Sequence, residues 1–155
     1  LTIPSYNMSI QVVSIGGVSL LQDLLSEDNV SFRYPAETWE DVIRHGGQLM
    51  VDAGFTDPTY TEAMIDVVRD MGPYIVLAPG LAMPHARPEM GAKQVGAALV
   101  TLEKPIDFGS PENDPVSVAI FLCAPNKDEE FLDAAVNFES IEDVQSFLAE
   151  HLDEA

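Results

Sequence analysis

Apolar residues recur at helical spacing in four parts of the chain, and each part predicts a helix. The predicted helices cover residues 17–26, a segment from Pro35 to Gly54, residues 57–71, and a final segment that opens at Ser140. The third has the clearest limits, because an aspartate can cap free helical amides, proline suits the first helical position, and Gly72-Pro73 stops the pattern. Ser140 and the acids after it give the last helix a similar start.

Other stretches are apolar at nearly every position, which is typical of strands covered on both faces. Residues 95–102 and 116–123 have this pattern and predict two central strands. Residues 30–33 predict a short strand, residues 104–108 a short edge segment, and residues 109–115 a turn. Helices precede and follow the strands and no period repeats. The predicted fold class is therefore α/β (α+β), a single domain whose mixed central β-sheet is flanked by helices on both faces.

The length of the chain and its two ends affect the domain assignment. With 155 residues, 46% of them hydrophobic, the chain fits one domain with a core large enough to fold alone. It begins with Leu1 and Met8 suits a natural start, so we expect residues 1–7 to be a leader and residues 8–155 to form the domain. A very short element follows residue 125, which suggests a segment missing near residues 129–131; an intact mass equal to the printed 16.9 kDa would reject this.

Cysteine and charge content limit the classes of partner. The single Cys123 excludes an internal disulfide and sits in an apolar strand pattern, which favours a buried thiol and a cytoplasmic location. No apolar run reaches the roughly 18–20 residues needed to cross a bilayer. Seven Lys+Arg against 26 Asp+Glu give a net charge of −19, so nucleic acids and anionic lipids are poor partners. The acid excess suits a partner with a basic or apolar docking face, or serves solubility alone.

Residues 74–88 hold the best candidate for chemistry, His85. Three prolines and Gly80 within ten residues leave the backbone little freedom, because each proline fixes its own φ and restricts the residue before it. Such a stretch presents a side chain in one orientation, and a neutral imidazole open to solvent is a nucleophile. A lone histidine near a loop is more often a surface or core residue, which is our interpretation of His45 and His151. Spacing alone leaves both interpretations of His85 open.

Residues 80–85, Gly-Leu-Ala-Met-Pro-His, resemble the enzyme IIA family of the bacterial phosphotransferase system, mannitol/fructose type. The similarity also covers, in chain order, Tyr60 and Ala63-Met64 before this motif and residues 102–108, residues 113–116, Ala124-Pro125 and the segment that opens at Ser140 after it. Within the family, residues 72–89 look most like the L-ascorbate branch.

The resemblance implies a sugar-specific phosphoryl carrier. In this family the histidine that matches His85 takes a phosphoryl group from the phosphocarrier HPr and passes it to an enzyme IIB, so His85 is the implied catalytic residue. A phosphohistidine intermediate and a role in L-ascorbate uptake follow from the same resemblance. Phosphoryl transfer asks mainly for in-line positioning and neutralisation of charge, for which a histidine suffices as nucleophile. No cofactor is implied, and one histidine with scattered acids predicts no metal site.

Three residues are candidates to stabilise the phosphoryl group or orient His85. Mannitol-type members place an arginine on the helix before the motif; that position falls near Asp66, and Arg69 lies at a similar distance in the sequence. The family's second histidine would fall around residues 128–130, where this chain has acids or lacks residues. Arg87 is the nearest basic residue and could bind phosphate oxygens bidentately, while Asp66 could instead orient the imidazole. Each also fits a plain surface residue.

The surface around His85 would have to serve two partners in turn. We therefore expect an exposed apolar patch for partner docking around Leu81 and Met83. A homodimer is also compatible with the sequence. Two alternatives to the transport carrier stay open: a regulatory IIA-like module that senses phosphorylation state and binds a regulator, and a ligand-binding domain without transfer. Passage of labelled phosphate to a IIB cysteine would separate the transport carrier from the regulatory module.

Overall fold

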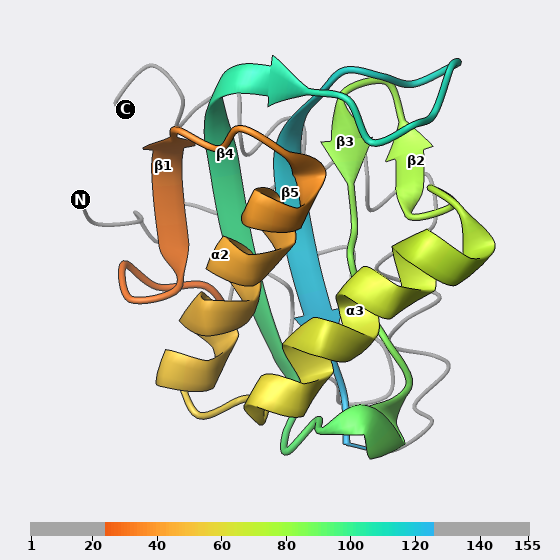
Figure 1. Ribbon diagram of the computed structural model, residues 1–155. Coiled ribbons are helices and arrows are strands. Elements are labelled where there is room, and N and C mark those ends of the chain that lie inside the picture. Colours follow the sequence, from red (N-terminus) through yellow and green to blue (C-terminus); the bar gives the residue numbers. More distant parts are fainter. Residues whose placement is uncertain (1–23, 126–155) are drawn as a thin grey trace.

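The protein is built on a mixed five-stranded sheet. The computed structural model describes residues 24–125. In chain order the elements are β1 (Val30–Tyr34), α2 (Trp39–Asp52), α3 (Pro58–Met71), β2 (Val76–Ala78), β3 (Leu81–Ala82), the 3₁₀ turn η2 (Pro88–Met90), β4 (Gly96–Ile106) and β5 (Val116–Cys123). The strand order is β1-β4-β5-β3-β2, in which β1–β4 and β3–β5 are parallel pairs and β4–β5 and β2–β3 are antiparallel (Figure 1). The predicted α/β class with a mixed sheet is confirmed.

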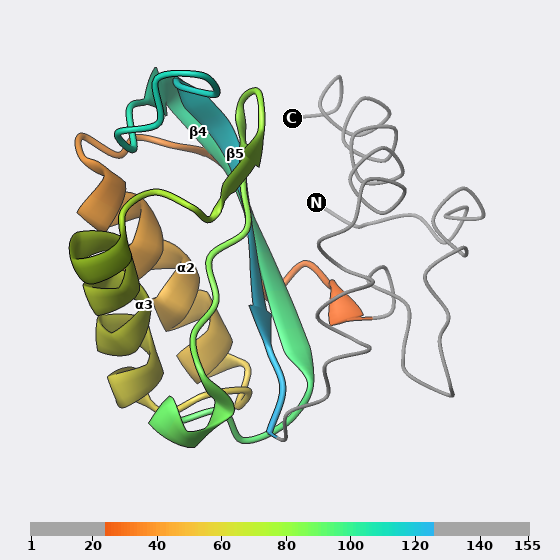
Figure 2. The same cartoon turned by 90° about the vertical axis from the view of Figure 1, so that its right-hand side faces the viewer.

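Helices α2 and α3 pack beside each other on one face of the sheet (Figure 2). The core between helices and sheet uses alternate residues of the central strands, because successive side chains point to opposite faces. Its members include Ala98, Val100 and Leu102 of β4, Ala119, Phe121 and Cys123 of β5, Val42, Ile43 and Met50 of α2, and Met64, Ile65 and Val68 of α3. A Cβ at Gly46 would overlap the ring of Phe121. Only glycine therefore lets α2 lie this close to β5.

The opposite face of the central strands is also buried. Leu99 of β4 and Ile120 and Leu122 of β5 are all fully buried, although α2 and α3 both lie on the other side of the sheet (Figure 2). The helix predicted from Ser140, most of the helix predicted over residues 17–26, and the segment around residues 128–131 lie outside the described residues. A helical layer on this second face stays a prediction.

The start of α2 differs from the prediction. The helix begins at Trp39, not near Pro35, because Thr38 caps it: the Thr38 hydroxyl accepts the N–H of Asp41, and the Asp41 carboxylate accepts the N–H of Thr38. This reciprocal pair satisfies two amides that the helix itself leaves unbonded. The predicted start of α3 is confirmed, with Pro58 at its first turn, but the Asp57 side chain makes no capping bond.

Residues 104–108 do not form a separate edge segment, and that prediction is wrong. Most of them extend β4 as far as Ile106, which pairs with Val116 after an irregularity in the register. A single long strand has room to continue because β5 begins directly opposite its end. The predicted turn at residues 109–115 is confirmed, and the carboxylate of Asp114 closes it by accepting three backbone N–H groups, from Phe108, Gly109 and Ser110.

Candidate functional site

The segment that carries His85 continues directly from β3. Figure 2 shows the chain leaving β3 and running along the sheet as an extended segment to η2. Backbone bonds hold it from both sides: the N–H of Met83 donates to the carbonyl of Ile75 at 2.9 Å, and the N–H of Leu122 donates to the carbonyl of Pro84 at 3.1 Å. The stiffness expected from the prolines is therefore reinforced by pairing with both neighbouring segments.

The imidazole of His85 is bonded through one nitrogen. Its Nδ1 lies 2.9 Å from the carbonyl oxygen of Met83. A carbonyl oxygen can only accept, so Nδ1 carries the proton and, in the neutral ring, Nε2 carries the lone pair. No hydrogen bond from residues 24–125 reaches Nε2, and the side chain is half-buried. The ring is thus fixed in orientation through Nδ1, and no group in the described part of the chain uses Nε2.

Tyr74 contacts the ring of His85 and restricts its rotation. The two ring centroids are 6.1 Å apart with an interplanar angle of 84°, an edge-to-face contact. Tyr74 itself is 47% exposed. The β2–β3 hairpin creates this contact, since it pairs Val76 with Ala82 and so brings the residues just outside the pair together. Sequence reasoning missed Tyr74, because its only signal is an aromatic residue at the start of the apolar stretch that ends before Pro79.

Tyr60 of α3 is a second aromatic residue to which sequence reasoning gave no role at the His85 site. Its hydroxyl accepts the N–H of Ala86 at 2.9 Å and lies 2.8 Å from the carbonyl of Leu122 and 3.2 Å from that of Ala86. Tyr60 is 1% exposed, and this burial raises the pKa of its hydroxyl. The group therefore keeps its proton at any working pH and can always donate.

The three predicted supporting residues make no recorded bond to His85. Arg87 is exposed and follows two residues later; its role stays a prediction. Arg69 points toward α2, where its guanidinium lies 3.7 Å from the carboxylate of Glu40. Asp66 is exposed, and the prediction that it orients the ring is wrong, because the acceptor for the bonded nitrogen is the Met83 carbonyl.

The predicted docking patch at Leu81 and Met83 is also wrong. Leu81 is 2% exposed and Met83 is 0% exposed. The reason is the position of β3, which lies inside the sheet with β2 on one side and β5 on the other. Side chains of an inner strand point to the two faces of the sheet, and both faces are covered here. An apolar surface for partners has to be sought elsewhere.

Two other chemistry-bearing side chains have structural roles. The His45 ring stacks on Tyr34, with centroids 3.7 Å apart and planes 6° apart, and its Nε2 lies 2.9 Å from the hydroxyl of Ser31. Burial lowers the pKa of His45. Cys123 is fully buried, and burial raises the pKa of its thiol to about 12. The sequence-based interpretation of Cys123 as a buried, unreactive thiol agrees with this environment.

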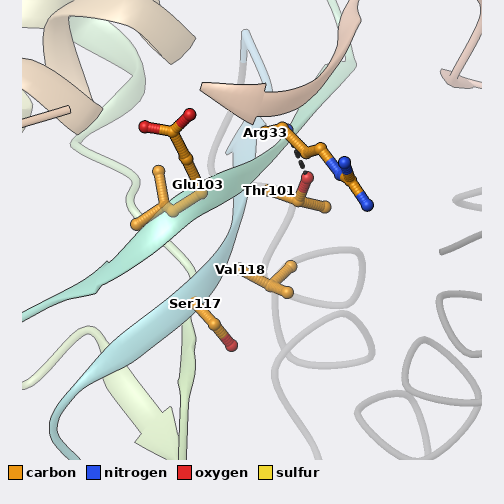
Figure 3. Close-up of a pocket in the computed structure, with 6 residues that line it drawn as sticks. Arg33, Thr101, Glu103, Ser117 and Val118 are labelled. Atoms are coloured by element: carbon orange, nitrogen blue, oxygen red, sulfur yellow. Dashed lines mark hydrogen bonds between the residues drawn. The ribbon is translucent and has the colours of Figure 1, made fainter. Parts of the chain in front are cut away.

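One cavity of about 370 Å³ lies away from His85, over the paired ends of β4 and β5. It is lined by Arg33, Thr101, Leu102, Glu103, Ser117 and Val118. Figure 3 shows the side chains of Arg33 and Glu103 pointing away from each other, while the backbone N–H of Arg33 donates to the Thr101 hydroxyl at 2.8 Å. The cavity shares no lining residue with the His85 site.

Residues 24–125 lack two features. Within this range no group of three or more histidine, cysteine or carboxylate side chains is arranged to hold a metal ion. None of the helices in the same range is both long and apolar enough to cross a membrane.

Comparison with known proteins places the chain in a family. Residues 23–151 match the model for "Phosphoenolpyruvate-dependent sugar phosphotransferase system, EIIA 2". The ascorbate-specific PTS system EIIA component of Shigella boydii serotype 4 (strain Sb227) is 49% identical over 105 residues, which are 67% of this chain and 68% of that protein.

Solved structures show the same fold. The mannitol-specific cryptic phosphotransferase enzyme IIA CmtB from Escherichia coli superposes with a TM-score of 0.70 at 32% identity, covering 82% of this chain and 88% of that one. The complex of enzyme IIAMTL and phosphorylated enzyme IIBMTL from Escherichia coli gives a TM-score of 0.65 at 22% identity, covering 81% and 97%, which shows likeness of fold alone. The chain therefore belongs to the EIIA 2 family of the phosphoenolpyruvate-dependent sugar phosphotransferase system.

Proposed function

We propose that this IIA component carries its phosphoryl group on Nε2 of His85, accepting it from phosphorylated HPr and passing it to an enzyme IIB. The observation that carries the proposal is the hydrogen bond from Nδ1 of His85 to the Met83 carbonyl, which leaves the lone pair on Nε2. Of the two described histidines, His45 has its Nε2 bonded and one ring face stacked, so it is the poorer acceptor.

The transfer step needs only the groups at this site and the donor. The Nε2 lone pair attacks phosphorus as the bond from phosphorus to its former carrier atom breaks, and the electron pair of that bond stays on the donor. The phosphorylated ring carries a positive charge that the Met83 carbonyl, already bonded to Nδ1–H, stabilises. In the next step a IIB cysteine attacks phosphorus and His85 leaves as neutral imidazole. Such a loose transfer depends on alignment more than on covalent help.

Arg87 is the proposed counter-charge for the phosphoryl oxygens. It is exposed, lies two residues beyond His85, and stands directly before η2. A guanidinium can reach equatorial oxygens with two parallel N–H groups, which an ammonium cannot do. Arg69 is a weaker candidate, since Glu40 already partly neutralises it.

L-ascorbate is the proposed sugar. Support comes from the 49% identity to an ascorbate-specific EIIA component and from the resemblance of residues 72–89 to that branch. A location in the cytoplasm, without nucleic acid as a partner, fits a carrier that acts between HPr and IIB.

The test is incubation with phosphorylated HPr followed by intact-mass measurement. The wild type should gain one phosphoryl group, His85→Ala should gain none, and His45→Ala should gain one. Adding the ascorbate-type IIB should then return the wild type to its original mass as label appears on the IIB cysteine. Label that stays on His85 with IIB present would favour the regulatory module, and uptake by His85→Ala would reject His85 as the acceptor.

A further inference from the structure

The strand ladder between β3 and β5 changes at His85. In β3, Leu81 pairs with Val118 and Ala82 with Ala119, in parallel. The same register, continued by three residues, sets His85 opposite Leu122. A regular parallel pair at this point requires two bonds: the N–H of Leu122 to the carbonyl of Pro84, and the N–H of Ala86 to the carbonyl of Leu122.

Only the first of these two bonds is direct. The N–H of Leu122 donates to Pro84 at 3.1 Å. In place of the second, the N–H of Ala86 donates to the Tyr60 hydroxyl at 2.9 Å, and that hydroxyl lies 2.8 Å from the carbonyl of Leu122. The phenol oxygen is therefore inserted between the donor and the acceptor of one ladder bond.

The chemistry of the hydroxyl fits this insertion. A phenol can accept one hydrogen bond while donating another, so it satisfies both the Ala86 N–H and the Leu122 carbonyl. Burial raises the pKa of Tyr60, so the proton needed for the donation is always present. Because the ring of Tyr60 extends from α3 into the hydrophobic core, the hydroxyl sets the distance between the chain after His85 and β5.

We propose that Tyr60 is a positioning residue for phosphoryl transfer: its hydroxyl interrupts the β3–β5 ladder at His85 and so fixes the backbone from which the imidazole projects. This inference rests on the proposed function of His85. Both peptide groups that flank His85 are held, one by Leu122 directly and one by Tyr60. Without the hydroxyl, the ladder closes by a direct bond or the Ala86 N–H is left unpaired, and either change moves His85.

The test compares Tyr60→Phe with wild type in the rate of phosphorylation by phosphorylated HPr. Tyr60→Phe removes one oxygen and keeps the ring. The rate at saturating HPr should fall about 10- to 100-fold, because small misplacement of a reacting group has effects of this size. The KM for phosphorylated HPr should stay the same, since Tyr60 is buried. Val68→Ala is the matched control: it removes buried apolar volume from the same helix but no hydrogen-bonding group, and its rate should equal that of wild type.

A second measurement uses the wild type alone and does not depend on the variant folding. The Tyr60 hydroxyl proton should give a slowly exchanging NMR signal with a nuclear Overhauser effect to the Ala86 amide proton. A folded Tyr60→Phe with a saturating rate within about twofold of wild type, or the lack of that Overhauser effect, would overturn the proposal. If the wild type takes no phosphate, the proposed function fails, and with it the positioning role, whereas the Overhauser effect still reports the inserted hydroxyl.

Discussion

His45 and His85 are each held by a hydrogen bond and an aromatic ring, yet the two arrangements have different consequences for the imidazole. At His45 the bond uses Nε2 and Tyr34 covers a ring face at 3.7 Å. At His85 the bond uses Nδ1 and Tyr74 stands edge-to-face at 6.1 Å. The first arrangement fastens α2 to β1. The second fixes an imidazole while leaving its outer nitrogen without a hydrogen bond from residues 24–125.

The two histidines differ in which ring nitrogen is hydrogen-bonded and in the angle between the imidazole and the neighbouring tyrosine ring. A histidine packed face to face gains dispersion and loses access. A histidine that is hydrogen-bonded to a carbonyl of its own segment loses rotational freedom, but its other nitrogen stays accessible to a reacting group. Both features follow from the backbone, since Ser31 and Met83 are placed by β1 and by the β3 extension.

The largest contrast should come from deleting each ring. His85→Ala should abolish transfer of label to IIB and change the free energy of unfolding by less than about 1 kcal/mol, because the side chain is half-buried and makes a single hydrogen bond to residues 24–125. His45→Ala should keep transfer and lose about 1–3 kcal/mol of stability. Urea unfolding and label transfer, measured on the same samples, test the predicted contrast between the two variants. Loss of transfer in both variants would contradict it.

The next effect concerns the counter-charge, which only His85 needs. Arg87→Ala should slow phosphorylation of His85 about 10- to 100-fold, since a charge-assisted hydrogen bond contributes about 1.5–3 kcal/mol. Arg44→Ala is the control, because Arg44 is ion-paired with Glu62 on the outer side of the helices. Stopped-flow or quenched assays with phosphorylated HPr measure both. Equal rates for Arg87→Ala and wild type would make Arg87 a plain surface residue.

The ring partners should give a smaller effect. Tyr74→Ala should slow phosphorylation about 3- to 10-fold, because an edge-to-face contact contributes roughly 0.5–1.5 kcal/mol to holding the imidazole. Tyr74→Phe should restore the rate, since the contact with His85 uses the ring and the Tyr74 hydroxyl makes no hydrogen bond within residues 24–125. A Tyr74→Phe rate as low as that of Tyr74→Ala would show that the hydroxyl acts instead.

The smallest effect is the pH dependence of stability at His45. Burial lowers its folded-state pKa below the unfolded value, so between the two the unfolded chain binds more protons and stability falls as the pH is lowered. In wild type, the urea midpoint should therefore fall from pH 7.5 toward pH 5.5. In His45→Gln part of this fall should be missing. An identical acid dependence in wild type and His45→Gln would mean that other groups cause it.

Sequence patterns predicted most of the helices and strands within residues 24–125 and singled out His85 as a candidate, but they did not predict its surroundings. Helix α3, the two central strands and the Pro-His motif have strong local signals. Tyr74 and Tyr60 are separated from His85 by 11 and 25 positions in the chain. Only the hairpin pairing of β2 with β3 and the packing of α3 on the sheet bring them close, and neither can be derived from local periodicity.

The errors have the same origin. Leu81 and Met83 could be taken as exposed because the sequence does not reveal that β3 is an inner strand. Asp66 was a reasonable acceptor for a nitrogen of the His85 ring. The structure uses a backbone carbonyl instead, that of Met83, which lies two positions before His85 in the sequence. Main-chain acceptors carry no sequence signal, so a bond of this kind can be found only from the path of the backbone.

The central claim is that Nε2 of His85 accepts the phosphoryl group. The most direct measurement is NMR of the ¹⁵N-labelled, phosphorylated protein, in which coupling to ³¹P identifies the nitrogen that is bonded. The coupling should appear on Nε2 of His85, with Nδ1 still protonated. Coupling on Nδ1, or on a residue other than His85, would contradict the account.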